Sequence, residues 1–204
     1  MSDPGAEVTG GRGEMYVVDS PHEVARWRPL AQWVLAIPHL FVAGGVGALT
    51  RAVAVIYWFK HLFTKKLDPE LYKALAMGER YELRTSGYLL GFSEQFPPFD
   101  FPLAVDDNGA YPPVALNLPE LPESSHRGAA WNILKAIPHY FVVAFFAIGA
   151  VFVLLAAWFA VLFTGRWPEG MRRYLVRLTN YYLRVWVYVL MVDNTYPKFG
   201  LSPA

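Results

Sequence analysis

Two stretches of sequence that lie 100 residues apart decide the fold. Residues 36–64 read AIPHLFVAGGVGALTRAVAVIYWFKHLFT, and residues 136–164 read AIPHYFVVAFFAIGAVFVLLAAWFAVLFT. The second stretch carries no charged side chain. As a helix, about 25 apolar residues rise about 37 Å, which is enough to cross a hydrocarbon core of about 30 Å. We therefore expect an all-α, integral membrane helical protein.

The match between the two stretches continues along most of the chain without a gap. The motif FPPF at 96–99 returns as YPKF at 196–199. Other residues shared at this spacing are Tyr81 and Tyr181, Arg84 and Arg184, and Tyr88 and Tyr188. Because many shared residues are Pro, His, Trp or Arg, common hydrophobicity does not explain the match. The sequence thus predicts two tandem helical-hairpin repeats.

Four segments follow from this duplication. Residues 1–20 are polar and Gly-rich, lack the apolar centre of a secretory signal, and are expected to be a disordered tail. The first membrane repeat covers 21–99 and the second covers 128–204. Between them, the Pro-rich acidic connector 100–127 is unsuited to a long helix and is expected to lie outside the hydrocarbon.

The distribution of basic residues predicts a topology. They follow each apolar run, as Lys60, Lys65, Lys66 and Lys73 and as Arg166, Arg172 and Arg173. The positive-inside rule places both of these loops in the cytoplasm and the connector outside. Both runs then cross in the same direction, so the polar second elements at 71–92 and 174–192 must cross as well. This predicts about four membrane helices, as two parallel hairpins, in a bacterial inner (plasma) membrane.

Two other topologies stay open. The second elements can lie on the membrane surface as amphipathic helices, which leaves two spans. The first run can also form a re-entrant hairpin bent at Gly44 and Gly45.

Composition argues for lipid and against several activities. Hydrophobic residues make up 54% of the chain and charged residues only 17%, fewer than in typical soluble domains. The net charge of +1 does not indicate a nucleic-acid partner, and the lack of cysteine excludes a thiolate metal site. No serine lies in a nucleophile elbow, and no Gly-rich loop carries the lysine of a phosphate-binding loop. The sequence therefore does not indicate an enzyme.

His39 and His139 are the weak candidates for a metal or cofactor site. Two imidazoles at equivalent repeat positions can hold haem if they face each other. The alternative is a structural role at the membrane interface, and no further ligand residues lie at suitable spacing. We expect no cofactor, with haem as the alternative.

An Arg/Tyr face on the second elements is the candidate site for lipid or a protein partner. Tyrosines lie three or four residues from each arginine, on one side of a helix. The candidate residues are Arg84, Arg184, Tyr81, Tyr181, Tyr88, Tyr188, Arg51 and Arg166. Arg51 lies within the first apolar run and is expected to face other helices or an acid of a partner subunit. The alternative role is an internal network that fixes helix register.

These motifs together resemble a bacterial membrane protein family of unknown function, DUF4389, in two tandem copies. The resemblance rests on Ile-Pro-His before a long apolar helix, the turn Phe-Thr-Gly-Arg-Trp-Pro at 163–168, and the Tyr/Phe-Pro motif that ends each copy. It covers about 26–201. Copy one has Thr-Lys-Lys-Leu at 64–67 in place of the Gly-Arg turn, and Lys198 replaces the second proline in copy two. The resemblance implies a multi-helix membrane protein without an agreed activity.

These observations favour a non-catalytic integral membrane protein. It would be a scaffold or accessory subunit that binds membrane lipids, another membrane protein or a second copy of itself. A small transporter or channel-like protein is one alternative, and a bis-His haem or quinone redox protein is another.

Overall fold

The helices of the two copies follow each other in the same order. The computed structural model describes residues 14–123, 125 and 128–202. The elements are β1 (Tyr16–Val18), α1 (Arg28–Leu35), α2 (Ile37–Thr64), α3 (Pro69–Leu89), β2 (Val114–Leu116), η1 (Ala129–Trp131), α4 (Asn132–Lys135), α5 (Ile137–Thr164) and α6 (Glu169–Val189). The two predicted long helices, the helical second elements and the tandem repeat are confirmed.

Local sequence explains where the long helices begin and end. Pro38 and Pro138 lie in the first turns, where a missing N–H group costs no helical hydrogen bond. Each long helix stops at a residue in the left-handed conformation, Lys65 (φ 59°) in α2 and Gly165 (φ 71°) in α5. The left-handed residue turns the chain back, so that α3 and α6 pack against α2 and α5.

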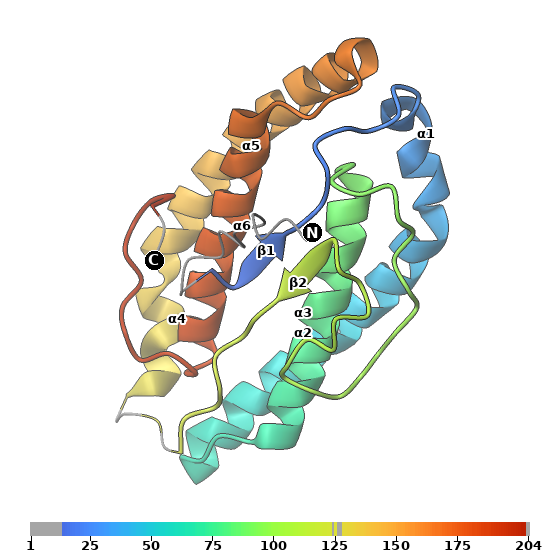
Figure 1. The fold of residues 1–204 in the computed structure, drawn as a ribbon. Coiled ribbons are helices and arrows are strands. Elements are labelled where there is room, and N and C mark those ends of the chain that lie inside the picture. The colour runs from blue at the N-terminus through green and yellow to red at the C-terminus, as the bar shows by residue number, and fades with distance from the viewer. Residues whose placement is uncertain (1–13, 124, 126–127, 203–204) are drawn as a thin grey trace, which may run out of the picture.

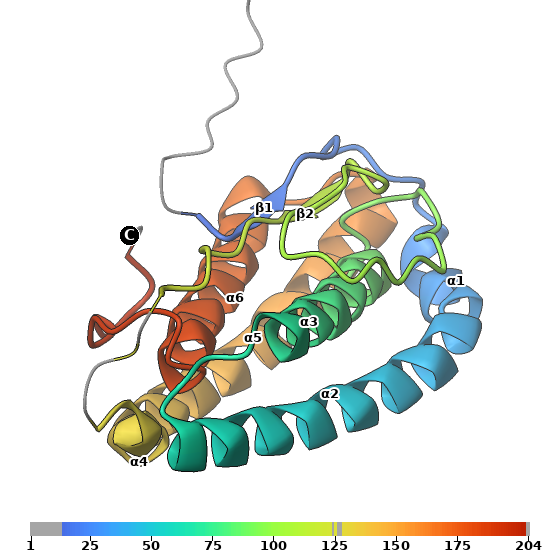
Figure 2. The same ribbon diagram turned by 90° about the horizontal axis from the view of Figure 1, so that it is seen from below.

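A two-stranded sheet covers the second helices. β1 pairs antiparallel with β2, with Tyr16 opposite Leu116. β1 contacts α6 and β2 contacts α3, so the sheet bridges the two copies (Figure 1). Figure 2 shows α3 between this sheet and α2. The predicted disordered tail is wrong for its last part, because residues 16–18 are strand β1; residues 1–13 lie outside the described residues.

The long helices run antiparallel, since α2 and α5 begin at opposite ends of the molecule (Figure 1). The helix that precedes each long helix packs against the other copy. Trp58 Nε1 of α2 donates to the Ala130 carbonyl at 2.9 Å, and Trp158 Nε1 of α5 donates to the Pro29 carbonyl. The prediction of parallel hairpins is therefore wrong. The leading helix, which precedes each long helix, packs against the other copy, and the long helices of the two copies run in opposite directions.

Two of the described helices, α2 and α5, are long and apolar enough to cross a membrane. Only 11% of the most apolar window of each is buried inside the molecule. The other two long helices, α3 and α6, are more polar and largely buried beneath the sheet and connector.

Candidate functional site

The three motifs of copy one meet at a single buried histidine. His39 lies in the first turn of α2, and its Nδ1 is 2.7 Å from the Tyr81 hydroxyl on α3. Its ring stacks on Phe99 with centroids 4.1 Å apart, and Phe96 lies beside it at 4.5 Å. The Ile-Pro-His motif, the Arg/Tyr helix and the Phe-Pro-Pro-Phe turn therefore form one cluster.

Copy two repeats this cluster with matching geometry. The His139 Nδ1 atom is 2.7 Å from the Tyr181 hydroxyl, and the ring stacks on Phe199 at 4.1 Å. Tyr196 takes the place of Phe96. Because α2 and α5 begin at opposite ends (Figure 1), the structure does not bring the two histidines together in one site.

Tyr88 and Tyr188 support the same clusters from the ends of α3 and α6. Their rings pack edge-on against Phe96 and Tyr196, at 5.4 and 5.6 Å. Their backbone carbonyls accept hydrogen bonds from Gln32 and Asn132 of the leading helices. In each copy, these contacts hold the leading helix and the closing aromatic turn against the end of the second long helix, α3 or α6.

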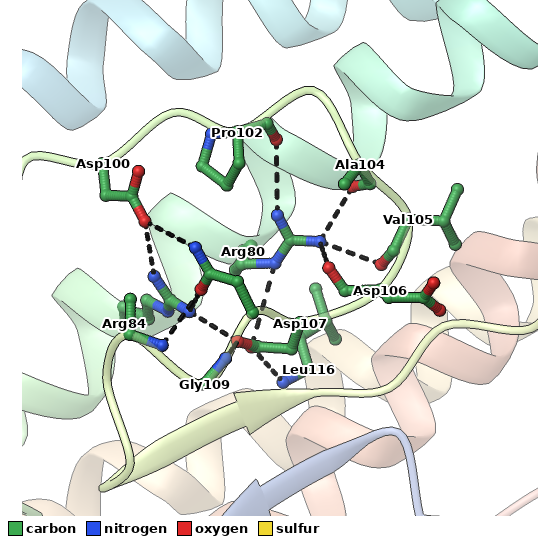
Figure 3. Close-up of polar contacts among 12 residues, drawn as sticks. Arg80, Arg84, Asp100, Pro102, Ala104, Val105, Asp106, Asp107, Gly109 and Leu116 are labelled. Atoms are coloured by element: carbon green, nitrogen blue, oxygen red, sulfur yellow. Dashed lines mark hydrogen bonds and ion pairs between the residues drawn. The ribbon is translucent and has the colours of Figure 1, made fainter.

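Arg84 lies in a buried ion-pair network rather than on a free surface (Figure 3). Its Nη2 donates to Asp107 Oδ1 at 2.6 Å, and its Nη1 lies 3.9 Å from Asp100 Oδ2. Arg80, one turn earlier on α3, has its Nε 3.8 Å from the second oxygen of Asp107. The side chains of Arg80, Arg84 and Asp107 are all at least nine-tenths buried.

The connector wraps around the guanidinium of Arg80. Its Nη2 donates to the carbonyls of Ala104, Val105 and Asp106 at 2.9 to 3.0 Å. Asp107 in turn accepts from the backbone N–H groups of Gly109 and Leu116. Sequence reasoning missed this network; the available signal was two arginines one helical turn apart on α3 and paired aspartates in the connector.

Copy two uses the same helix face to hold other extended segments. Arg184 donates to the carbonyls of Gly200 and Ser202 at 2.9 and 3.1 Å, and its guanidinium lies over Tyr181. Asn180, which replaces Arg80, accepts from the Tyr16 N–H and donates to the Tyr16 carbonyl. Arg84 and Arg184 therefore hold different segments, each of which follows the helix that carries the arginine.

A second polar group lies between the copies. Burial and the neighbouring Glu82 raise the pKa of Glu79 to about 8, while a hydrogen bond from Tyr182 opposes the rise. Burial also raises the pKa of Glu82, and the charge of Arg51 opposes that rise. Arg51 itself is exposed on α2, and Arg166 is exposed in the loop after α5.

The arrangement does not point to metal chemistry. Within the part of the chain that the structure describes, no group of three or more His, Cys, Asp or Glu is placed to hold a metal ion.

The strongest surface feature is an apolar face on the two long helices. On α5, exposed aromatic and aliphatic side chains recur every three or four residues, the period of one helix face. They include Phe141, Phe145, Ile148, Phe152, Leu155, Phe159 and Phe163. Phe41, Leu49, Ile56, Phe59 and Phe63 form the matching stripe on α2. The leading helices add exposed tryptophans, Trp27, Trp33 and Trp131.

The fold and this face define a duplicated, mostly helical protein with two candidate membrane helices. The chain belongs to the family described as Domain of unknown function (DUF4389), whose model matches residues 26–100 and 128–200 as two tandem copies. No curated protein and no solved structure matches the chain significantly.

Proposed function

We propose that this chain is a non-catalytic membrane protein that lies in one leaflet and serves as a scaffold or accessory subunit. The one observation that carries the proposal is the one-sided apolar face of α1, α2, α4 and α5. Large apolar patches on a surface mark a contact with lipid or with a partner. Here the residues include many Phe, Leu and Ile, with tryptophans in or next to the leading helices, which makes an apolar surface suited to contact with lipid.

The layer formed by the sheet and the connector favours an orientation in which α2 and α5 lie flat in one leaflet over an orientation in which they cross the membrane. The connector follows α3 from its start, where the Tyr72 hydroxyl donates to the Pro119 carbonyl, to its end, where Gly87 abuts Val114. If α2 and α5 crossed a bilayer, this irregular backbone and the partly exposed Asp100 would lie at hydrocarbon depth. Irregular backbone exposed to lipid loses its hydrogen bonds to water, which is strongly unfavourable.

The basic loops support the same orientation. Because the long helices are antiparallel, crossing would leave Lys65 on one side of the membrane and Arg166 on the other. That arrangement conflicts with the positive-inside rule. In a flat orientation both loops can contact anionic headgroups of the same leaflet, which contributes about 1 kcal/mol per basic residue.

Impermeant thiol labelling separates this proposal from a multi-pass protein with four spans in the plasma membrane. The chain has no native cysteine, so single cysteines can be introduced at the exposed positions Lys65, Asn108 and Arg166. In sealed membrane vesicles the flat orientation requires all three to be labelled from the same side. Labelling of any one from the opposite side overturns it. Labelling of positions 65 and 166 from opposite sides would support long helices that cross the membrane.

The role as a scaffold rests on the face turned away from the lipid. In a flat orientation the sheet and connector are presented to water and are available to a partner protein. Recovery of the intact protein in mild detergent, with cross-linking of the Asn108→Cys variant, tests this role. A stoichiometric partner or self-association through this layer supports it, whereas a strictly monomeric and uncross-linked protein in native membranes contradicts it.

A further inference from the structure

An apolar groove lies where the two copies meet. It has a volume of about 440 Å³ and is lined by α1, the end of α3, the second half of α5 and Trp167. This volume falls within the range of about 300–1,000 Å³ that is common for sites of small ligands. Trp33, Leu155 and Trp158 form part of its wall and are also exposed on the apolar face. The groove is therefore open to whatever covers that face.

Two of the indole N–H groups beside the groove, those of Trp158 and Trp167, are already satisfied. Trp158 donates to the Pro29 carbonyl, and Trp167 donates to the Gly91 carbonyl at 2.8 Å. Their ring faces are left to contact a ligand through apolar carbon atoms. Gln32 also lines the groove, and its side-chain N–H groups donate to the carbonyls of Tyr88 and Ser93.

One cationic side chain, that of Arg28, lines the groove. The Nε atom of Arg28 is buried and has no hydrogen-bond partner among the described residues. The side chain is only 14% exposed, and its terminal nitrogens are directed to Glu94 and Gln32. Glu94 Oε2 lies 3.8 Å from Arg28 Nη2 and offsets part of the charge, and the guanidinium leaves positive charge beside the groove. A long apolar wall with one cationic donor at its end matches a fatty acyl chain that carries an oxygen at its polar end.

We propose that this groove binds one acyl chain of a membrane phospholipid, with an ester or phosphate oxygen of that lipid accepting from Arg28. The inference rests on the proposed membrane orientation, because the bilayer is the source of the lipid. The equivalent place in the other copy differs in chemistry: Arg51 stands where the groove has Val151. The site is thus assigned to the side formed by α1 and α5.

Native mass spectrometry of the full chain, purified from phospholipid membranes in mild detergent, tests the site. The wild-type protein should retain one phospholipid per chain. Val151→Trp fills the groove from an exposed position and should lower the lipid-bound fraction at least about tenfold. Ile148→Trp is the matched control, since Ile148 is equally exposed one turn earlier but does not line the groove. Arg28→Gln should weaken retention about tenfold, the effect of losing a charged hydrogen bond.

Several outcomes overturn the site. These are equal retention by the Val151→Trp and Ile148→Trp variants, a bound fatty acid instead of a phospholipid, and a wild-type chain that carries detergent alone. Melting curves of each variant exclude unfolding as the cause of lipid loss. Flotation with anionic vesicles keeps the two proposals apart. If the wild-type chain floats but retains no lipid, the groove proposal fails alone; if it does not float, the membrane orientation fails.

Discussion

At the scale of single residues, the histidine of each copy is held by a tyrosine. The Nδ1 of His39 and the hydroxyl of Tyr81 are both buried, so each depends on the other for a hydrogen bond. A buried polar atom that loses its partner costs about 1–3 kcal/mol. The His–Tyr pair therefore ties α2 to α3 without the help of solvent.

We predict that Tyr81→Phe destabilises the protein by about 1–3 kcal/mol, because the His39 ring keeps its place but loses its partner. Thermal unfolding in detergent measures this loss. Tyr196→Phe is the matched control, because copy one already has phenylalanine at the equivalent position 96. A loss for Tyr81→Phe no larger than for Tyr196→Phe would show that the hydrogen bond does not stabilise the fold.

Glu79 gives the stability of the protein a pH dependence with a definite sign. Its ordinary pKa of 4.5 is raised to about 8 in the fold. Between these values the folded state keeps a proton that the unfolded chain releases. Stability from this group is therefore full below about pH 4.5, falls as the pH rises, and is lost above about pH 8.

Glu79→Gln should remove this pH dependence, since glutamine stays neutral at every pH. We expect similar melting temperatures for variant and wild type at pH 5, and a variant that melts at least about 10 °C higher at pH 9. Glu70→Gln, on the exposed first turn of α3, serves as the control. A variant that melts below the wild type at pH 9 would mean that the charged carboxylate is the form that stabilises the fold.

At the scale of elements, the two copies end their helices with the same left-handed turns but with different residues. α2 stops at Lys65 where α5 has Gly165. In the turns after α3 and α6, copy one has the glycine: the left-handed residue is Gly91 in copy one and Met191 in copy two. A side chain in this conformation costs about 1–2 kcal/mol relative to glycine.

Lys65→Gly is therefore expected to stabilise the protein by about 1 kcal/mol, which raises the melting temperature by about 2–4 °C. Lys66→Gly removes the same charge at the next residue, where φ is not positive, and should give no gain. Equal effects of the two substitutions would trace any change to charge instead of backbone conformation.

The sequence was sufficient for the helices but not for how they are arranged. Apolar length and the 100-residue repeat located α2 and α5, because those signals are local or depend on simple self-comparison. β1 was missed because its three residues pair with a strand nearly 100 residues away. The antiparallel arrangement was missed because it depends on contacts such as Trp58 with the Ala130 carbonyl, which no local pattern encodes.

The tyrosines and the two arginines Arg84 and Arg184 of the candidate Arg/Tyr face lie on α3 and α6, but their contacts were not foreseen. The partners of Arg84 come from the connector, whose acids were used only to assign a side of the membrane. An ion pair between distant segments leaves no periodic signal in the chain. The binding role predicted for Arg84 and Arg184 stays a prediction, and the structure adds a role in holding the connector and the C-terminal segment.

At the scale of the whole molecule, α3 packs between α2 and the sheet, and the connector is attached to α3. Arg80 donates to the carbonyls of Ala104, Val105 and Asp106, and Asp107 pairs with both Arg80 and Arg84. Because Asp107 pairs with both arginines, its removal weakens two of these contacts at once.

Asp107→Ala should cost about 3–5 kcal/mol, because it leaves two buried guanidinium groups without their carboxylate. Glu169→Ala breaks the exposed pair with Arg173 and should cost less than about 1 kcal/mol. Thermal unfolding in detergent compares the two losses, and limited proteolysis reports whether the connector is released. We expect rapid cleavage within 100–123 in the Asp107→Ala variant alone, while vesicle flotation stays unchanged because the apolar face is intact. Equal and small losses for both variants, with the connector still protected, would mean that its packing against α3 does not depend on the ion pairs.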